Sequence, residues 1–247
     1  MKVVQLAGLR TRILPDRVER SMNGARLVVL LHGYGAPGTD LIPLGSEIDA
    51  PAGTWYAFPE GPVDVGAELG YPGADARGWW PIDMVRLQTA SMTGQWSAEL
   101  PNLVNGLPEA AHRVAALLDA LEQEIGIPSA RTYLGGFSQG AMVSLQVALA
   151  EARALAGLIF MSGAAADLGS IQAQAAARGP LRIVMSHGRN DPILPFGAAL
   201  QIRERLAAAG WDVRWLESDG GHAIAPEVIP EVGRMLHEPL AEKEASG

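Results

Sequence analysis

Short apolar runs alternate along the chain with longer segments in which apolar residues recur at helical spacing. Runs of the first kind are typical of strands that are buried on both faces of a sheet, and segments of the second kind are typical of helices that pack on it. The pattern therefore predicts an α/β fold with a mostly parallel sheet covered on both faces. We expect strands at residues 26–31, 54–58, 132–135, 156–161, 181–186 and 213–217, and an antiparallel edge from residues 3–6 and 9–14.

Proline and glycine mark the ends of several predicted helices. Pro108 suits a first helical position, where its missing N–H costs nothing, and Gly126 and Gly210 suit helix ends. An alanine-rich stretch that closes with Gly179-Pro180 predicts a shorter helix. We expect helices at residues 108–125, 141–151, 171–177, 196–209 and 226–236.

One segment, residues 79–107, follows neither the strand period nor the helical period. It carries tryptophans and methionines, which argues against disorder, and long irregular segments inside compact domains usually have a function. We therefore expect residues 1–247 to form a single domain in which residues 79–107 are a flap or pocket-lining insertion. Core packing or a dimer contact is the alternative. The residues expected to face a substrate pocket are Trp79, Trp80, Met84 and Trp96.

Composition narrows the class of protein. With 247 residues, 48% of them hydrophobic, the chain is long enough for a sizeable core, but no apolar run approaches the roughly 20 residues that span a membrane. The net charge is −8 and no basic cluster is present, so nucleic acid is not expected as a partner. The absence of cysteine excludes disulfides and thiolate metal sites. The first eight residues lack the apolar stretch of a signal peptide, and we expect a cytoplasmic protein with no integral membrane segment.

The candidate chemistry centres on residues 136–140, which read Gly-Phe-Ser-Gln-Gly. This sequence matches the Gly-x-Ser-x-Gly nucleophile elbow, and it lies between a predicted strand and a predicted helix, as that turn requires. A serine at the tip of so sharp a turn has strained backbone, and its neighbours must be small for the strand and the helix to approach each other. A chance match in a chain with 29 glycines is the alternative. The context favours Ser138 as a nucleophile.

A serine hydroxyl needs a base to remove its proton, and this base is usually a histidine that a carboxylate orients. In this type of fold the order along the chain is serine, acid, histidine. His222 follows the last predicted strand, where such sheets place their chemistry, whereas His237 ends the terminal helix. We therefore expect His222 to be the base.

Three aspartates are candidates for the acid. Asp191 follows a predicted strand, precedes Pro192, and leaves room for one helix and one strand before His222. Asp167 follows the preceding strand, and Asp219 lies close to His222, where it is equally suited to brace the histidine loop. Position along the chain favours Asp191.

Attack on a carbonyl leaves negative charge on its oxygen, and hydrogen-bond donors must stabilise that charge. One expected donor is the backbone N–H of Gln139, directly after the nucleophile. The second is expected in residues 31–35, Leu-His-Gly-Tyr-Gly, which follow the first long parallel strand and whose glycines allow the N–H groups to turn inward. We favour the N–H of Tyr34 over that of Gly33, and we interpret His32 as a packing or bracing residue.

These motifs resemble those of the α/β-hydrolase superfamily and, more narrowly, of the phospholipase/carboxylesterase family, which includes acyl-protein thioesterases and small bacterial carboxylesterases. The resemblance runs from about residue 26 to residue 236 and depends on residues 31–35, 136–140, 188–192 and 221–222. It implies a three-layer sandwich, with triad roles for Ser138, Asp191 and His222 and oxyanion roles for Tyr34 and Gln139. Two segments near the expected pocket depart from the family pattern, namely residues 59–62, which read Pro-Glu-Gly-Pro, and residues 84–107, which are long and apolar.

We therefore predict a serine esterase that cleaves small-molecule carboxylic esters through an acyl-serine intermediate, with no metal and no organic cofactor. A thioesterase or lysophospholipase with the same residues is the first alternative, because the carbonyl chemistry is shared. A catalytically silent binding protein on a hydrolase fold is a second, since a fold alone does not prove activity. A hydrolase of carbon–carbon bonds or of peptides is a third. The natural ester and the oligomeric state stay open at this stage.

Overall fold

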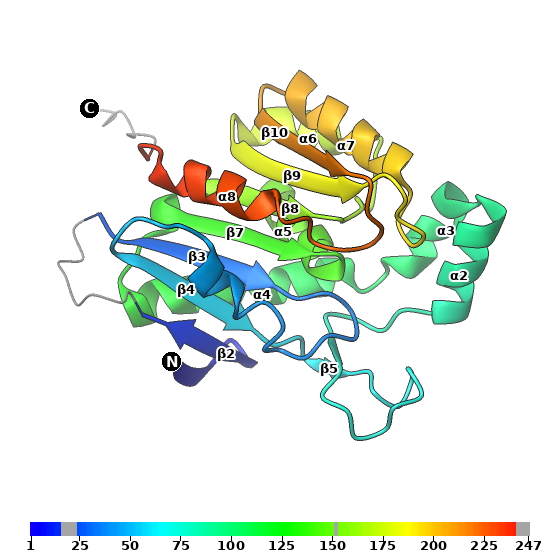
Figure 1. Cartoon of the computed structure of the whole chain (residues 1–247), viewed down its shortest axis with the longest axis horizontal. Coiled ribbons are helices and arrows are strands. Elements are labelled where there is room, and N and C mark those ends of the chain that lie inside the picture. Colours follow the sequence, from blue (N-terminus) through cyan, green and yellow to red (C-terminus); the bar gives the residue numbers. More distant parts are fainter. Residues whose placement is uncertain (16–23, 151–152, 241–247) are drawn as a thin grey trace.

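Eight strands form the central sheet of the computed structural model, which describes residues 1–15, 24–150 and 153–240 (Figure 1). Their order across the sheet is β1-β2-β4-β3-β7-β8-β9-β10. β1 and β2 are antiparallel, β2 is antiparallel to β4, and the later neighbours are parallel. The predicted mostly parallel sheet and its antiparallel edge are thus confirmed. The strands are β1 (Lys2–Leu6), β2 (Leu9–Leu14), β3 (Arg26–Leu31), β4 (Thr54–Pro59), β7 (Thr132–Phe137), β8 (Gly157–Met161), β9 (Arg182–Gly188) and β10 (Asp212–Ser218).

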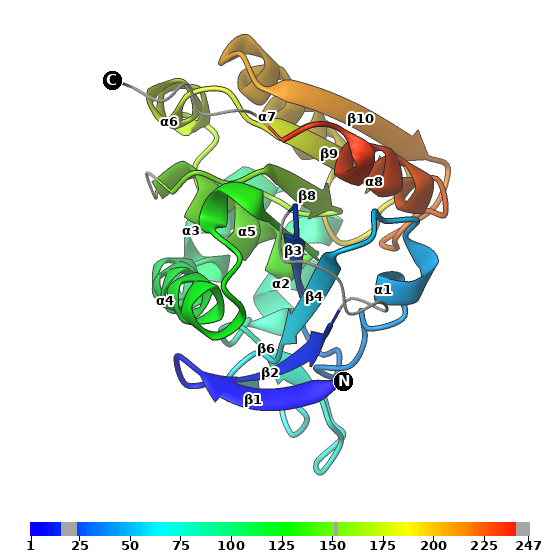
Figure 2. The same ribbon diagram turned by 90° about the vertical axis from the view of Figure 1, so that its left-hand side faces the viewer.

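Helices cover both faces of this sheet (Figure 2). Alternate residues of β3 show the two layers: Val28 and Leu30 pack in a core with α8, whereas Val29 and Leu31 pack in a second core with α4 and α5. All five predicted helices are present, with ends that differ from the prediction by at most two residues; the predicted helix end at residue 151 lies outside the described residues. They are α4 (Leu107–Ile125), α5 (Gln139–Ala150), α6 (Ile171–Arg178), α7 (Phe196–Ala208) and α8 (Val228–His237).

Residues 84–103 fold into two short helices, where the sequence pattern led us to expect irregular chain. α2 (Met84–Thr93) begins after Asp83, whose side chain accepts from the Arg86 N–H at 2.9 Å, and it ends at Gly94, with φ of +69°. α3 (Trp96–Leu103) contains Pro101. The expectation was wrong for a different reason in each helix. α2 has a single fully buried residue among those described, so no apolar stripe marks it in the sequence. α3 buries Trp96, Leu100 and Leu103 at helical spacing, but Pro101 inside it argued against a helix.

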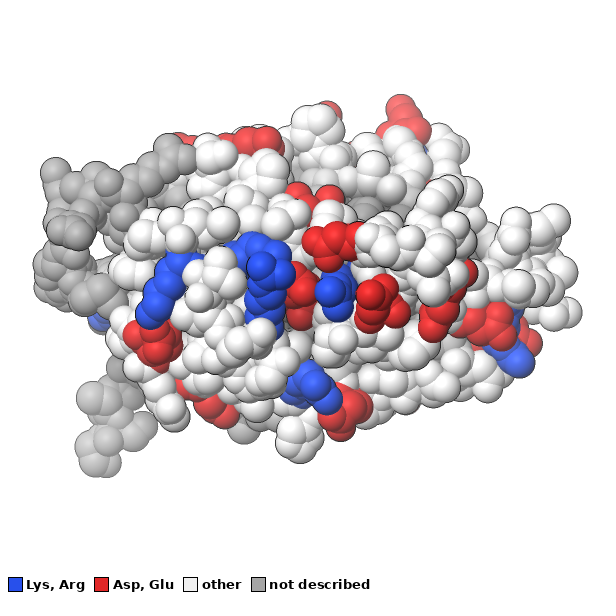
Figure 3. Space-filling view, turned by 90° about the horizontal axis from the view of Figure 1, so that it is seen from below, with Lys and Arg blue, Asp and Glu red and all other residues white. Residues whose placement is uncertain are grey.

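Smaller elements connect these layers. They are α1 (Leu44–Glu47), the two-stranded pair β5 (Val63–Asp64) and β6 (Arg77–Gly78), and the 3₁₀ turn η1 (Ser129–Arg131). On the face shown in Figure 3, acidic and basic side chains lie next to one another, so opposite charges are interspersed there. Among the described residues, no helix combines the length and the apolar character that a membrane crossing requires.

Candidate active site

Ser138 lies at the turn between β7 and α5, in the left-handed region with φ of +53°. The flanking glycines are required by close main-chain contacts: a Cβ on Gly136 would lie 2.5 Å from the Leu31 oxygen, and one on Gly140 would lie 2.1 Å from it. The Ser138 N–H donates to the Met161 carbonyl in β8 at 2.9 Å. The turn is therefore fixed by β3 on one side and by β8 on the other, and these contacts hold the Ser138 side chain in one position.

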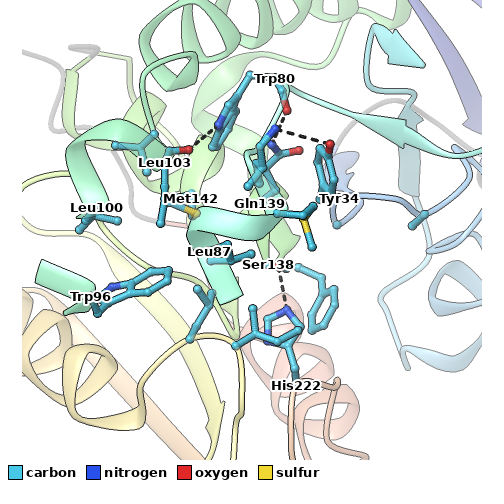
Figure 4. Close-up of a pocket in the computed structure, with 18 of the residues that line it drawn as sticks. Tyr34, Trp80, Leu87, Trp96, Leu100, Leu103, Ser138, Gln139, Met142 and His222 are labelled. Atoms are coloured by element: carbon cyan, nitrogen blue, oxygen red, sulfur yellow. Dashed lines mark hydrogen bonds between the residues drawn. The ribbon is translucent and has the colours of Figure 1, made fainter. Parts of the chain in front are cut away.

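His222, in the loop between β10 and α8, contacts both of the other predicted residues through its two ring nitrogens. Nε2 is 2.8 Å from the Ser138 hydroxyl oxygen, and Nδ1 is 2.7 Å from Asp191 Oδ2. The ring packs on Phe137, with 4.9 Å between ring centroids. Figure 4 shows Ser138 and His222 facing each other across the first of these hydrogen bonds. With its proton on Nδ1, the imidazole donates to the carboxylate and is free to accept the hydroxyl proton on Nε2.

Asp191 occupies the turn after β9, and its carboxylate is fully buried. Oδ1 accepts from the N–H groups of Ile193 and Leu194 at 2.8 and 2.9 Å, while Oδ2 faces His222. Burial alone would raise the pKa of Asp191, but hydrogen bonds from two histidines and from the Leu194 N–H outweigh burial and hold this pKa well below its usual range. The carboxylate is therefore ionised at neutral pH and is held in one orientation.

The other candidate residues have surroundings of their own. Asp167 is exposed and accepts from a backbone N–H of its own turn at 2.8 Å. The Asp219 side chain is 95% exposed, and its backbone carbonyl accepts from a neighbouring asparagine at 2.8 Å, so it braces the loop before His222. His237 ends α8, half exposed, near a surface aspartate. Within the described residues, Asp191 is the candidate acid that contacts His222, and no group of three or more His, Cys, Asp or Glu residues is placed to hold a metal ion.

His187, to which the sequence analysis gave no role, contacts the same carboxylate. Its side chain is fully buried in β9, and Nε2 lies 2.9 Å from the Leu194 carbonyl oxygen and 3.3 Å from Asp191 Oδ2. An Nε2–H group at this position holds both arms of the turn that carries Asp191. The signal that would have found it is its place at the end of the same strand, four residues before the acid.

The loop after β3 passes directly beside the nucleophile, since a Cβ on Gly33 would lie 3.4 Å from the Ser138 Cβ. His32 holds this loop with both ring nitrogens: Nδ1 lies 2.8 Å from the Gly33 carbonyl oxygen, and Nε2 accepts from the Gly61 N–H at 2.9 Å. Burial lowers the pKa of His32, so the ring stays neutral and keeps one donor and one acceptor. These contacts match the bracing role that the sequence suggested for His32.

Residues 59–62, one of the two segments that depart from the family pattern, support that loop and do not line the cavity described next. Glu60 is buried and pairs with Arg12 at 2.9 Å and with Arg77 at 3.5 Å. The Gly61 N–H that donates to His32 follows directly. The ion pairs of the buried Glu60 carboxylate thus fix the segment whose Gly61 N–H donates to His32.

A cavity of about 170 Å³ opens beside Ser138 (Figure 4). Trp80, Met84 and Trp96 line it, as expected. Trp79 does not, and we correct that prediction: its indole is buried and donates its N–H to the His32 carbonyl, in the loop after β3, at 2.9 Å. The remaining lining is mostly apolar and includes Tyr34, Ile82, Leu87, Leu100, Leu103, Val104, Phe137, Gln139, Met142, Ile193, Leu194 and His222.

A second, more open groove follows the outer side of α2. Met84, Leu87 and Ile193 line both the groove and the cavity, so the two spaces adjoin. The Ser91 hydroxyl donates to the Pro192 carbonyl at 2.5 Å, which ties α2 to the turn that carries the acid. The other residues of the groove are Val85, Gln88 and Met92.

Sequence comparison relates the chain to hydrolases. The model of the phospholipase/carboxylesterase family matches residues 17–237. Acyl-protein thioesterase 1 of Gibberella zeae is 33% identical over 129 residues, which are 50% of this chain and 55% of that protein. Acyl-protein thioesterase 1 of Schizosaccharomyces pombe is 39% identical over 94 residues, which are 37% of this chain and 41% of that protein. The aligned part thus spans roughly half the length of these relatives.

Comparison of structures gives the same fold over nearly the whole chain. Esterase PE8 is 28% identical, with a TM-score of 0.74 over 92% of this chain and 97% of that one. The Bacillus cereus carboxylesterase is 15% identical, with a TM-score of 0.68 over 92% and 93% of the two chains. These similarities confirm the predicted α/β-hydrolase fold.

Proposed function

Since the chain belongs to the phospholipase/carboxylesterase family, we propose that it is a serine esterase that cleaves carboxylic esters through an acyl-serine intermediate. One observation carries the proposal: the contacts run unbroken from the Ser138 hydroxyl through His222 to Asp191, at 2.8 and 2.7 Å. A hydroxyl, an imidazole and a buried carboxylate in this order are the groups that acyl transfer to serine requires.

In the acylation half of the reaction, Ser138 Oγ attacks the ester carbonyl carbon while its proton passes to His222 Nε2. The carbonyl electron pair moves onto the oxygen, where the backbone N–H groups of Tyr34 and Gln139 stabilise the charge. The oxyanion then collapses, the bond to the alcohol oxygen breaks, and His222 returns the proton to the leaving alcohol. Asp191 orients the imidazole and stabilises its charged form without taking its proton.

In the deacylation half, water takes the place of the alcohol. His222 Nε2 accepts a proton from this water, the resulting hydroxide oxygen attacks the acyl carbon, and the same N–H groups hold the second oxyanion. Collapse releases the carboxylic acid, and the proton on His222 returns to Ser138 Oγ. Every proton in the cycle moves through one imidazole nitrogen, so no further acid or base is needed.

The acyl group is proposed to occupy the cavity beside Ser138. Its volume of about 170 Å³ and its apolar walls suit small or medium acyl groups, including aromatic ones. In this proposal residues 1–247 are one domain, and residues 79–107 are its pocket-lining insertion. Support comes from Met84, Trp96 and Leu100, which extend from that insertion to the cavity.

A thioesterase that uses the same residues is the second candidate function. The observation that favours it is the similarity to two acyl-protein thioesterases, at 33% and 39% identity over the aligned parts. The same donors and the same base serve a thioester carbonyl, because only the leaving atom differs. Paired oxygen esters and thioesters of one acyl group distinguish the two functions through their kcat/KM values.

For the compartment we propose the cytoplasm. A chain with no cysteine gains nothing from an oxidising environment, which is compatible with a reducing one. Fractionation of cells that produce the protein at its natural level tests this location.

The proposed function is tested by rapid-mixing assays with p-nitrophenyl esters of rising acyl length. The wild type should release a burst of p-nitrophenolate equal to the enzyme concentration, followed by a slower steady rate, because acyl-Ser138 accumulates. Ser138→Ala should give neither burst nor turnover while it keeps the wild-type melting temperature. Retained hydrolysis in Ser138→Ala would remove Ser138 from its role. A folded wild type that cleaves only thioesters would favour the second candidate.

A further inference from the structure

Three buried hydrogen bonds connect the nucleophile turn with the loop after β3 by way of two tryptophans. Gln139 is 1% exposed, and both ends of its side-chain amide are used: Oε1 accepts from the Trp79 N–H at 2.7 Å, and Nε2 donates to the Trp80 carbonyl at 2.9 Å. The Trp79 indole N–H in turn donates to the His32 carbonyl at 2.9 Å. Figure 4 shows the Gln139 amide directed toward Trp80.

This path joins the two segments that carry the proposed oxyanion donors. The N–H of Gln139 stands at the start of α5, and the N–H of Tyr34 lies two residues after His32. The path runs outside the reacting atoms, so it can hold the two segments together before an ester binds. Donors act well only within about 2.7–3.1 Å of the developing oxyanion, so a small shift of one segment against the other lowers the rate.

We propose that the Gln139 side chain is a positioning residue that sets the spacing of the two oxyanion donors. This inference rests on the proposed function and adds a second role to a residue whose backbone N–H is already one donor. A primary amide suits the position because one end must accept from an N–H while the other donates to a carbonyl. Leucine at this position has neither capacity, and the methionine thioether is only a weak acceptor that cannot donate.

The same amide also links the donors to the wall of the cavity. Trp80 lines the cavity, and its indole N–H donates to the Leu103 carbonyl at the end of α3 at 2.9 Å. The Gln139 side chain therefore anchors the Trp79–Trp80 segment at the start of the insertion, directly after β6. Loss of the anchor disturbs the donors on one side and the cavity wall on the other.

The first test replaces the amide with an apolar side chain of similar length, Gln139→Met. The change keeps the backbone N–H but leaves the Trp79 N–H and the Trp80 carbonyl buried without partners. We expect kcat for p-nitrophenyl butyrate to fall about 10- to 100-fold, less than the roughly 100- to 1,000-fold loss when an entire donor is removed, with KM nearly unchanged. The inhibition constant of butylboronic acid, whose serine adduct is tetrahedral, should rise by a similar factor, because it needs the same donors.

The second test breaks the path at another bond. Trp79→Phe removes the indole N–H that holds His32 and keeps an aromatic ring, and we expect kcat to fall about tenfold. Because both changes interrupt one path, the double variant should be no slower than the slower single variant. The matched control is Ser144→Ala, which removes a buried hydrogen bond from the same helix, the 2.9 Å contact with the Ala141 carbonyl, and should keep kcat within twofold of the wild type.

Several outcomes overturn the inference. Wild-type kcat and boronic acid affinity in Gln139→Met would do so, as would independent, multiplying losses in the double variant, or an equal loss in Ser144→Ala. If Gln139→Met does not fold, Trp79→Phe decides alone, and wild-type kcat in that variant would also overturn it. Failure of the proposed function is separate, since it would appear as an inactive wild type or an active Ser138→Ala.

Discussion

The site at the strand ends and the α2–α3 insertion meet at one cavity, but they are built in different ways. Around Ser138, glycines pack against main chain and hydrogen bonds tie the turn to its neighbouring strands. In α2, by contrast, Val85 and Met92 are 76% and 81% exposed, and a side-chain bond links Ser91 to the turn of the acid. Under the proposed function, the strand-end site therefore sets the reaction, whereas the insertion, which can vary without disturbing that site, sets which acyl group fits.

The largest effect is expected for Asp191→Asn, in the rigid site at the strand ends. The amide cannot stabilise the charged imidazole and favours the wrong tautomer, so kcat should fall by about four orders of magnitude. Asp167→Asn is the matched control, because this exposed aspartate bonds only within its own turn among the contacts described, and its kcat should stay within twofold of the wild type. Steady-state kinetics with p-nitrophenyl butyrate measures kcat for both variants. A larger loss of kcat in Asp167→Asn would assign the role of the triad acid to Asp167.

Replacing one glycine in each region compares how much each region contributes to the free energy of unfolding. In Gly140→Ala the new Cβ would lie 2.1 Å from the Leu31 carbonyl oxygen, and we expect the free energy of unfolding to fall by about 3 kcal/mol or more. Gly94 is the left-handed residue that ends α2, and a Cβ added to it would have no neighbour within 4 Å among the described residues. Gly94→Ala should therefore cost only about 1 kcal/mol of backbone strain. Urea unfolding measures both values, and equal losses would show that the insertion is as tightly built as the elbow.

The strand-end residues could be predicted because each follows a strand of a parallel sheet. Ser138 follows β7, Asp191 follows β9 and His222 follows β10, so the topology alone brings the ends of their segments to one edge. Local glycine patterns then marked the sharp turns. Their meeting distances of 2.7 and 2.8 Å are consequences of the fold and were not visible in the sequence.

Side-chain direction and distant bonds could not be predicted in the same way. Trp79 and Trp80 are adjacent and chemically alike, yet only Trp80 lines the cavity, because the local path of the chain decides which indole turns inward. The bonds of the Gln139 amide reach residues 59 and 60 positions away, which no local pattern encodes. In the insertion, α2 was missed because its apolar residues mostly face a cavity and a groove and not the core. α3 was missed because Pro101 interrupts a helix whose Trp96 and Leu100 are in fact buried on one face.

An effect of intermediate size on kcat is expected for His187→Phe, also in the site at the strand ends. The ring bulk remains, but the nitrogen near the Leu194 carbonyl and Asp191 is lost, so kcat should fall roughly tenfold, the worth of about one hydrogen bond of 1.4 kcal/mol. The His187 hydrogen bond helps to lower the pKa of Asp191 in the folded protein. A carboxyl group with a lowered pKa stabilises the fold at pH values above the pKa of the unfolded chain, which is about 4, and this stabilisation is lost as the pH falls below that value. The stability gap between wild type and variant should therefore narrow when urea unfolding is repeated below pH 4. A gap that does not change with pH would exclude this link to Asp191.

The smallest effect is expected on the outer side of α2, with Val85→Ser and Met92→Ser combined. These exposed side chains line the groove that adjoins the cavity. Their replacement should leave kcat/KM for the acetyl ester within twofold of the wild type and lower kcat/KM for the decanoyl ester roughly threefold. A threefold change corresponds to slightly less than the roughly 0.8 kcal/mol gained by burying one methylene group. Val3→Ser, at another exposed apolar position, on β1 and away from the groove, is the control and should change neither value. Since both esters share one carbonyl chemistry, their ratio isolates binding of the chain from the reaction at Ser138. An equal loss on both esters would mean that α2 supports the reacting groups themselves, and the division between a rigid reaction site and a variable insertion would then fail.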